Sequence, residues 1–170
     1  MTNYIISPMF WLTFFLQISY TFTDHSFKKE IIDSGFFTNE VQIQYFVQSK
    51  NVGFVGYTKF PLVKFYVIHS LYIQPQHRNQ GYGRNLLQHA CQALQQLGAT
   101  QIYIQPGPFE ISESYMPNAE AKHRNIQKLV RFYESEGFKL VNWFTSFMAN
   151  ILYKIIGIDE NSSYLMVKKL

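Results

Sequence analysis

The stretch Leu71-Tyr72-Ile73-Gln74-Pro75-Gln76-His77-Arg78-Asn79-Gln80-Gly81-Tyr82-Gly83 leads from an apolar strand into an apolar helix. The first turn of a helix leaves backbone N–H groups without partners, and the helix dipole favours negative charge there. Glycines without Cβ atoms let the backbone approach an anion closely and adopt positive φ. We therefore predict that a diphosphate accepts backbone hydrogen bonds from several of residues Asn79, Gln80, Gly81, Tyr82, Gly83 and Arg84.

A pair of glycines one residue apart also fits an ordinary tight turn from a strand to a helix. Two other phosphate-binding loops are excluded by the sequence. There is no G-x-x-x-x-G-K-[ST] pattern, and Leu86 stands where the third glycine of a Rossmann loop would be. By itself, the loop therefore predicts an anion site and does not identify the ligand.

The elements around the loop predict a mixed sheet with helices packed on it. Alternating or continuous apolar residues predict strands, with a turn at Asn51–Gly53 between the first two. Apolar stripes predict two helices that end at Gly98 and Gly137. The predicted strands are 41–48, 54–60, 65–73, 101–105, 138–144 and 164–167, and the predicted helices are 83–97 and 120–136. This order predicts one α/β (α+β) domain, residues 1–170, with helices on both faces of a central sheet.

The N-terminal region has weaker signals. Residues 11–20 fit a strand or a helix. Asp24 then resembles a helix N-cap, Phe27 and Ile31 follow at helical spacing, and Gly35 stands where a helix would end. We therefore predict a helix over about residues 24–35. Residues 147–158 are apolar and ambiguous between strand and helix.

Composition excludes several classes of protein. Of the 170 residues, 47% are hydrophobic and 15% are charged, which is typical of a globular domain. The net charge of +4 suits an anionic ligand, and it would also suit nucleic acid. Because Lys and Arg are scattered along the chain, we expect no nucleic-acid partner.

We expect a cytoplasmic protein without membrane contact. The apolar segment 9–16 is preceded by no Lys or Arg and followed by no cleavage site of small residues. It is also much shorter than the ~20 apolar residues that a membrane helix needs. The single cysteine, Cys91, excludes a disulfide framework and fits a reducing compartment. No histidine pair has metal-ligand spacing, so we expect no metal.

Two motifs together resemble the GNAT superfamily of acetyl-CoA-dependent N-acetyltransferases. Arg78-x-x-Gly81-x-Gly83 between a strand and a helix resembles its motif A. Phe132-Tyr133-Glu134-Ser135-Glu136-Gly137-Phe138, which ends the next helix, resembles its motif B. The resemblance covers about residues 40–145. It implies a splayed pair of parallel strands whose backbone, at Leu71, Tyr72 and Ile73, pairs with the pantetheine of acetyl-CoA.

The resemblance also implies a direct attack of an amine on the thioester, without a covalent enzyme intermediate. Tyr133 matches the tyrosine that protonates the leaving thiolate. The alternative interpretation of Tyr133 is a tyrosine that only packs in the core. His69 stands where members carry a general base, and its alternative is a packed strand histidine.

One departure from the family pattern concerns an asparagine that contacts the cofactor in many members. Ile126 stands at its position in this chain, and Asn125 is the residue beside it. Asn125 is kept as a candidate contact. The long connection 106–124 is either a lid over the acceptor or a surface insertion. The sequence allows either a small-molecule or a peptide amine as the acceptor. It also allows either a monomer or a homodimer. The competing hypotheses are a non-catalytic acyl-CoA sensor and a basic nucleic-acid-binding domain.

Overall fold

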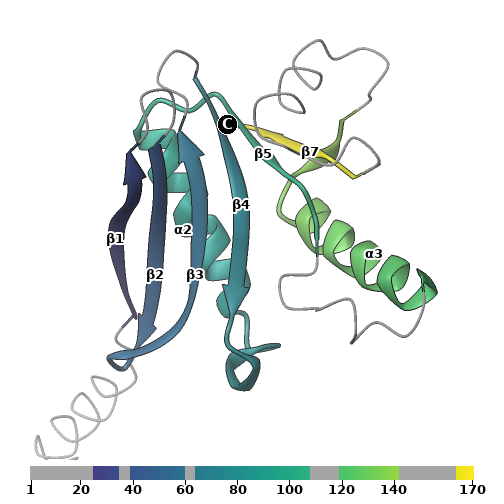
Figure 1. Cartoon of the computed structure of the whole chain (residues 1–170), viewed down its shortest axis with the longest axis horizontal. Coiled ribbons are helices and arrows are strands. Elements are labelled where there is room, and N and C mark those ends of the chain that lie inside the picture. Colours follow the sequence, from purple (N-terminus) through teal and green to yellow (C-terminus); the bar gives the residue numbers. More distant parts are fainter. Residues whose placement is uncertain (1–24, 35–38, 60–63, 108–118, 142–163) are drawn as a thin grey trace, which may run out of the picture.

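A seven-stranded sheet with the neighbour order β1-β2-β3-β4-β5-β7-β6 organises the molecule (Figure 1). The computed structural model describes residues 25–34, 39–59, 64–107, 119–141 and 164–170. In chain order the elements are β1 His25–Ser34, β2 Asn39–Val47, β3 Lys50–Lys59, β4 Phe65–Ile73, the 3-10 helix η2 Pro75–His77, α2 Tyr82–Gln96, β5 Gln101–Ile104, α3 Ala119–Ser135, β6 Lys139–Leu140 and β7 Met166–Lys169. The predicted mixed α/β fold is confirmed. The predictions for residues 9–20 and 147–158 lie outside the described residues, as do residues 108–118 of the predicted connection 106–124.

Strand β1 replaces the helix that the sequence predicts over residues 24–35. It pairs antiparallel with β2 along its whole length. Phe27 stacks on Tyr45 of β2, with ring centroids 4.6 Å apart. By contrast, Ile31 and Ile32 are 70% and 57% exposed. The prediction is wrong because pairing with a distant strand outweighs local periodicity, and a short run of apolar residues fits either period.

The turn between β2 and β3 lies earlier than the sequence predicts. Gln48 and Ser49 form it with φ of 50° and 62°, so both central residues have the positive φ of a two-residue hairpin turn. Gly53 is instead a strand residue, and a Cβ there would collide with the Tyr72 carbonyl oxygen of β4. The predicted turn at Asn51–Gly53 is wrong because this glycine serves close strand packing and not a turn.

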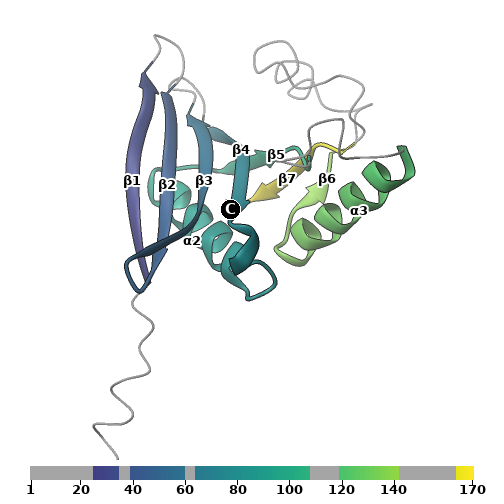
Figure 2. The same ribbon diagram turned by 60° about the horizontal axis from the view of Figure 1, so that its bottom comes forward.

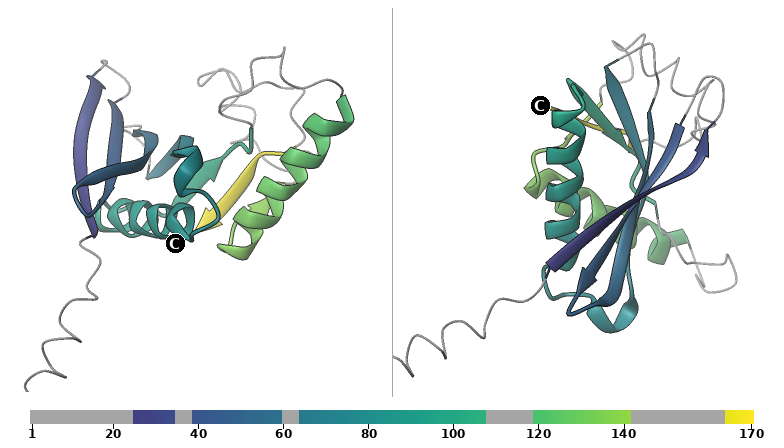
Figure 3. Two further views of the ribbon diagram at one scale, coloured as in Figure 1. Left: turned by 90° about the horizontal axis from the view of Figure 1, so that it is seen from below. Right: turned by 90° about the vertical axis from the view of Figure 1, so that its left-hand side faces the viewer.

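Two parallel crossovers place the described helices on one face of the sheet. β4 and β5 are parallel, and β6 runs parallel to β5 because each is antiparallel to β7. The connections through α2 and α3 move in the same direction across the sheet, and such connections are right-handed. Accordingly, α2 covers one face of β1–β4 and α3 lies beside β6 and β7 (Figures 2 and 3). A helix on the opposite face, which the sequence also predicts, is not among the described elements.

The apolar core lies between this face and the helices. The predicted stripe of α2 is buried, namely Leu86, Leu87, Ala90, Cys91 and Leu94. β2 contributes the predicted alternating set Val41, Ile43, Tyr45 and Val47. Val130 and Tyr133 of α3 belong to the same cluster. Both helices end at a glycine of positive φ, Gly98 at 84° and Gly137 at 87°, as the sequence predicts.

Candidate active site

A cleft opens where β4 and β5 part. Their parallel pairing runs only from Phe65↔Gln101 to Ile68↔Ile104, although β4 continues to Ile73. Figure 1 shows the two strands side by side at their starts and diverging toward their carboxyl ends. Among the described strands, β4 therefore has no partner on its β5 side beyond Ile68.

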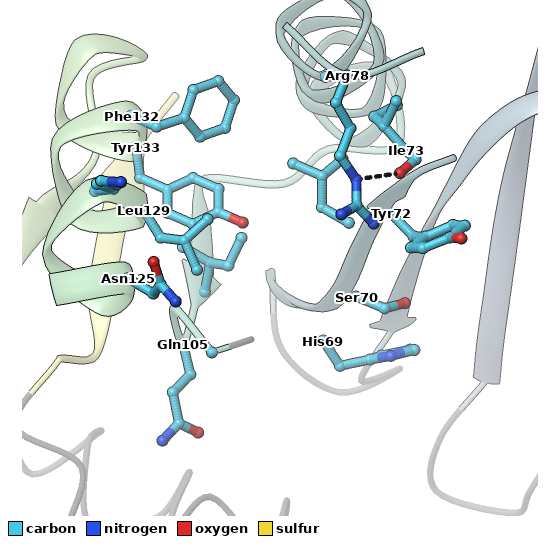
Figure 4. A pocket seen from close by; sticks show the side chains of 15 residues that line it. His69, Ser70, Tyr72, Ile73, Arg78, Gln105, Asn125, Leu129, Phe132 and Tyr133 are labelled. Carbon is cyan, nitrogen blue, oxygen red and sulfur yellow. Dashed lines mark hydrogen bonds between the residues drawn. The ribbon is translucent and has the colours of Figure 1, made fainter. Parts of the chain in front are cut away.

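The backbone of β4 turns alternate hydrogen-bonding groups toward this cleft. The N–H of Gln74 donates to the Val52 carbonyl of β3 at 2.9 Å. Because successive strand residues direct their backbone groups to opposite edges, those of Leu71 and Ile73 point into the cleft. Consistently, Arg78 Nε donates to the Ile73 carbonyl at 2.9 Å (Figure 4). Of the three strand residues that the sequence selects, Leu71 and Ile73 thus present backbone groups for pairing, whereas Tyr72 presents its backbone to β3.

The loop after β4 forms a helix start with available amides. Asn79 and Gly81 adopt positive φ, 61° and 83°. The first hydrogen bond within α2 joins the Asn85 N–H to the Gly81 carbonyl at 3.1 Å. The amides of Tyr82, Gly83 and Arg84 therefore precede the helical ladder and can donate to an anion.

Arg78 brings a positive charge to the cavity that Gly83 of this helix start also lines. Its guanidinium carbon lies 5.7 Å from the centroid of the Tyr72 ring. The Arg84 side chain turns elsewhere, because its Nε donates to Glu136 Oε1 at 2.6 Å. Arg84 can thus serve the anion through its backbone amide, and Arg78 through its side chain.

A cavity of about 480 Å³ occupies the cleft between β4 and α3. Eight of the predicted site residues line it, namely His69, Leu71, Tyr72, Ile73, Arg78, Gly83, Asn125 and Tyr133. Asn79, Gln80, Gly81, Tyr82 and Arg84 do not line it. The cavity therefore extends from the free edge of β4 to the first turn of α2. The other residues of the loop lie outside the cavity lining.

Tyr133 reaches the cavity from the last turn of α3. The residue is 5% exposed, and its hydroxyl points across the cavity toward β4 (Figure 4). That hydroxyl makes no hydrogen bond with the described residues, and burial raises the pKa of the phenol above its ordinary value. The phenol is therefore protonated at neutral pH and can donate a hydrogen bond to a ligand.

His69 is the extra residue of a β-bulge in β4. The β3–β4 register passes from Gly56↔Ser70 to Tyr57↔Ile68 and skips His69. A Cβ on Gly56 would lie 2.6 Å from His69 Cε1, so the imidazole lies across β3 on the face away from α2.

The surroundings of His69 keep its imidazole neutral. The side chain is exposed on one side, but partial desolvation lowers its pKa below the ordinary value, and the nearby Glu40 carboxylate opposes this by raising it. A neutral imidazole at neutral pH can accept a proton.

Seven cavity-lining residues are absent from the sequence-based candidates, namely Ser70, Ile104, Gln105, Gly107, Lys128, Leu129 and Phe132. The three in α3 could have been found, because they share one helix face with Asn125 and Tyr133 at spacings of three and four residues. Ser70 follows the bulge, which no local sequence pattern marks. Ile126 packs on the apolar core while Asn125 lines the cavity, so Asn125 is the polar residue at this level of the helix.

Two further observations concern only the described residues. They contain no group of three or more His, Cys, Asp or Glu side chains that could hold a metal ion. No helix among them is long and apolar enough to cross a membrane.

A free strand edge that leads to a helix start with available amides is an arrangement that can accommodate an extended ligand with an anionic group. The model of the acetyltransferase (GNAT) family matches residues 7–112, which is more than half of the 170 residues. The chain belongs to the acetyltransferase (GNAT) family. The matched region includes the anion loop and His69, and it ends before Tyr133. No curated protein has a sequence that matches this chain.

Solved structures share this fold at low sequence identity. PaiA N-acetyltransferase from Thermoplasma acidophilum, in complex with coenzyme A, has a TM-score of 0.51 and 17% identity over 77% of this chain and 61% of its own. Tetrahymena GCN5 has a TM-score of 0.53 and 12% identity over 76% and 68%. N-acetylglutamate synthase from Neisseria gonorrhoeae, complexed with coenzyme A and N-acetyl-glutamate, has a TM-score of 0.52 and 15% identity over 76% and 25%. The present chain thus spans less than two thirds of the first of these proteins and a quarter of the last.

Proposed function

We propose that this chain is an N-acetyltransferase that transfers the acetyl group of acetyl-CoA to an amine by direct attack in a ternary complex. The observation that carries the proposal is one cavity that contacts a free strand edge, a helix start with available amides and the hydroxyl of a largely buried tyrosine. Structures of similar fold that contain coenzyme A support the choice of ligand.

The cofactor end of the site would use mainly backbone groups. The pyrophosphate accepts hydrogen bonds from the amides of Tyr82, Gly83 and Arg84, and Arg78 compensates its charge. The pantetheine lies along Leu71 and Ile73, whose backbone groups face the cleft. Asn125 offers an amide from the opposite wall.

The reaction requires three tasks of the protein. Attack by the amine nitrogen on the thioester carbonyl forms the new C–N bond and places negative charge on the carbonyl oxygen. The Leu71 N–H, two residues after the bulged His69, would stabilise this oxyanion. Tyr133 donates to the sulfur as the C–S bond breaks, and His69 accepts the proton that the amine releases.

The acceptor would approach from the face of the sheet away from α2. The cavity is lined by His69 and Ser70 on that face and by Tyr133 and Leu129 on the helix side, so it reaches both faces through the gap between β4 and β5. His69 and Glu40 lie on the acceptor side. A carboxylate beside the base favours a cationic amine there.

The test measures thiol release from acetyl-CoA against a panel of amines, namely small amines, amino acids and peptides with free N-termini or lysines. A Cys91→Ser variant controls for reaction of the protein's own thiol, which is buried in the core. We expect acceptor-dependent thiol release and an acetylated product detected by mass spectrometry. Binding of coenzyme A without release for any acceptor would instead support a non-catalytic acyl-CoA sensor.

A further inference from the structure

A buried carboxylate joins the start of α2 to the end of α3. The Glu136 side chain is 6% exposed. Its Oε1 accepts from Arg84 Nε at 2.6 Å, and its Oε2 accepts from Gln88 Nε2 at 2.9 Å. Arg84 Nη2 also reaches the Ser135 hydroxyl at 3.4 Å. Both carboxylate oxygens are therefore held by α2, one turn apart along that helix.

On the α3 side, Glu136 belongs to the cap that fixes Tyr133. The Tyr133 carbonyl accepts the N–H groups of Glu136 and Phe138, both at 3.0 Å, and the Gly137 N–H donates to Glu134 at 2.9 Å. The bonds from Phe138 to Tyr133 and from Gly137 to Glu134 are the pair that defines a Schellman cap. The Phe138 ring also packs on the Tyr133 ring, with centroids 5.9 Å apart. The backbone of Tyr133 is thus bonded directly to the residue that α2 holds.

A second contact anchors the cap to the sheet. Lys168 Nζ of β7 donates to the Glu136 carbonyl at 2.8 Å. The Glu136 side chain therefore faces α2 while its main chain is held by β7. Because α2 holds its side chain and β7 holds its main chain, Glu136 can shift only if these contacts break or both elements move with it.

On the α2 side, Arg84 belongs to the turn that carries the candidate pyrophosphate amides. Its own N–H precedes the first hydrogen bond of the helix. An anion bound at this turn and the Tyr133 hydroxyl at the other wall of the cavity are consequently connected through one carboxylate.

We propose that Glu136 is a positioning residue that couples occupation of the anion site at the start of α2 to the placement of the Tyr133 hydroxyl. Removing it frees the end of α3 to shift, and misplacement of a reacting group by about 1 Å can lower a rate by roughly a hundredfold. The inference rests on the proposed function for its kinetic part, and it has a separate structural part in the coupling of the two helix ends.

The kinetic test compares Glu136→Leu with Glu134→Gln, a control that removes a carboxylate from an exposed position of the same helix end. We expect Glu136→Leu to lower kcat by about tenfold or more while KM for acetyl-CoA changes less. In a Tyr133→Phe background the same substitution should lower kcat little further, because its effect passes through the Tyr133 hydroxyl. Equal losses in both backgrounds, or an equal loss in Glu134→Gln, would overturn the proposal.

A second variant tests the proposal if Glu136→Leu does not fold. A second measurement tests it if the wild type shows no turnover. Arg84→Leu changes a side chain that is 54% exposed and removes the same ion pair. Hydrogen exchange is followed at residues 133–138 with and without coenzyme A. We expect coenzyme A to slow exchange at this cap in the wild type and not in Arg84→Leu. Equal protection in both proteins would overturn the coupling, whereas absence of turnover in the wild type would overturn only the proposed function.

Discussion

The two walls of the cleft offer different kinds of chemistry. The wall formed by β4 and the start of α2 presents backbone groups, at Leu71, Ile73 and the first turn of the helix. The wall formed by α3 presents side chains, above all Tyr133 and Asn125. The backbone contacts of the first wall should tolerate most side-chain changes except those that add atoms to glycine, whereas the α3 wall, like the His69 and Arg78 side chains, depends on single functional groups.

Loss of the Tyr133 hydroxyl should have the largest effect. Tyr133→Phe removes one oxygen that makes no hydrogen bond with the described residues, so the fold should persist. We expect kcat to fall by about a hundredfold or more, which is the scale of general acid catalysis. Affinity for acetyl-CoA, measured by calorimetry, should change little. The matched control is Tyr57→Phe, a buried tyrosine outside the cavity, and an unchanged kcat in Tyr133→Phe would remove the hydroxyl from the mechanism.

An added side chain at Gly83 should break the backbone wall. Gly83 lines the cavity, and a Cβ there would already lie 3.6 Å from Ile73 Cγ1. In Gly83→Val the larger side chain adds atoms next to the amides that we propose as the anion site. We expect the Kd for coenzyme A to rise by at least about tenfold, or ~1.4 kcal/mol. Calorimetric titration measures it, and Gly98→Ala at the other end of α2 controls for loss of helix stability. Unchanged affinity in Gly83→Val would mean that the ligand does not use this turn.

The pH profile should report on His69, a side chain that β4 contributes to the cavity. Desolvation lowers the pKa of His69, so the imidazole loses its proton at a lower pH than an ordinary histidine does. A base must be neutral to act, and kcat/KM should therefore rise with pH through this lowered pKa and be level at neutral pH. In His69→Ala we expect a lower kcat/KM without this acid limb. Retention of the wild-type limb in His69→Ala would place the base elsewhere.

Glu40→Gln should have the smallest effect and a predictable sign. The Glu40 carboxylate raises the pKa of His69, so its removal lowers that pKa further. The acid limb of the kcat/KM profile should then shift to lower pH, while the level at neutral pH stays nearly the same. Glu30→Gln on the neighbouring edge strand is the control, because Glu30 does not affect the pKa of His69. A shift to higher pH in Glu40→Gln would contradict the assignment.

Prediction from sequence succeeded where one local pattern determines the outcome. Strand β4 was predicted with the bounds that the structure shows, because its continuous apolar run is bounded by Pro75. The ends of α2 and α3 were predicted within a few residues, since a glycine of positive φ stops each helix. It failed for β1, where apolar spacing fitted a helix and only pairing with β2 decides for a strand.

The features of the candidate site likewise fall into two groups, those that a local sequence pattern predicts and those that depend on tertiary contacts. The sequence by itself predicted the helix start after β4 and its glycines, because amides without partners at a helix start and glycines without Cβ atoms are local properties. It also selected His69 and Tyr133 through their positions relative to motifs. Only the tertiary structure decided that β4 and β5 part at Ile68, that a bulge turns His69 across Gly56, and that Glu136 joins the two helices. These features depend on contacts between residues far apart in the chain, which no local pattern records.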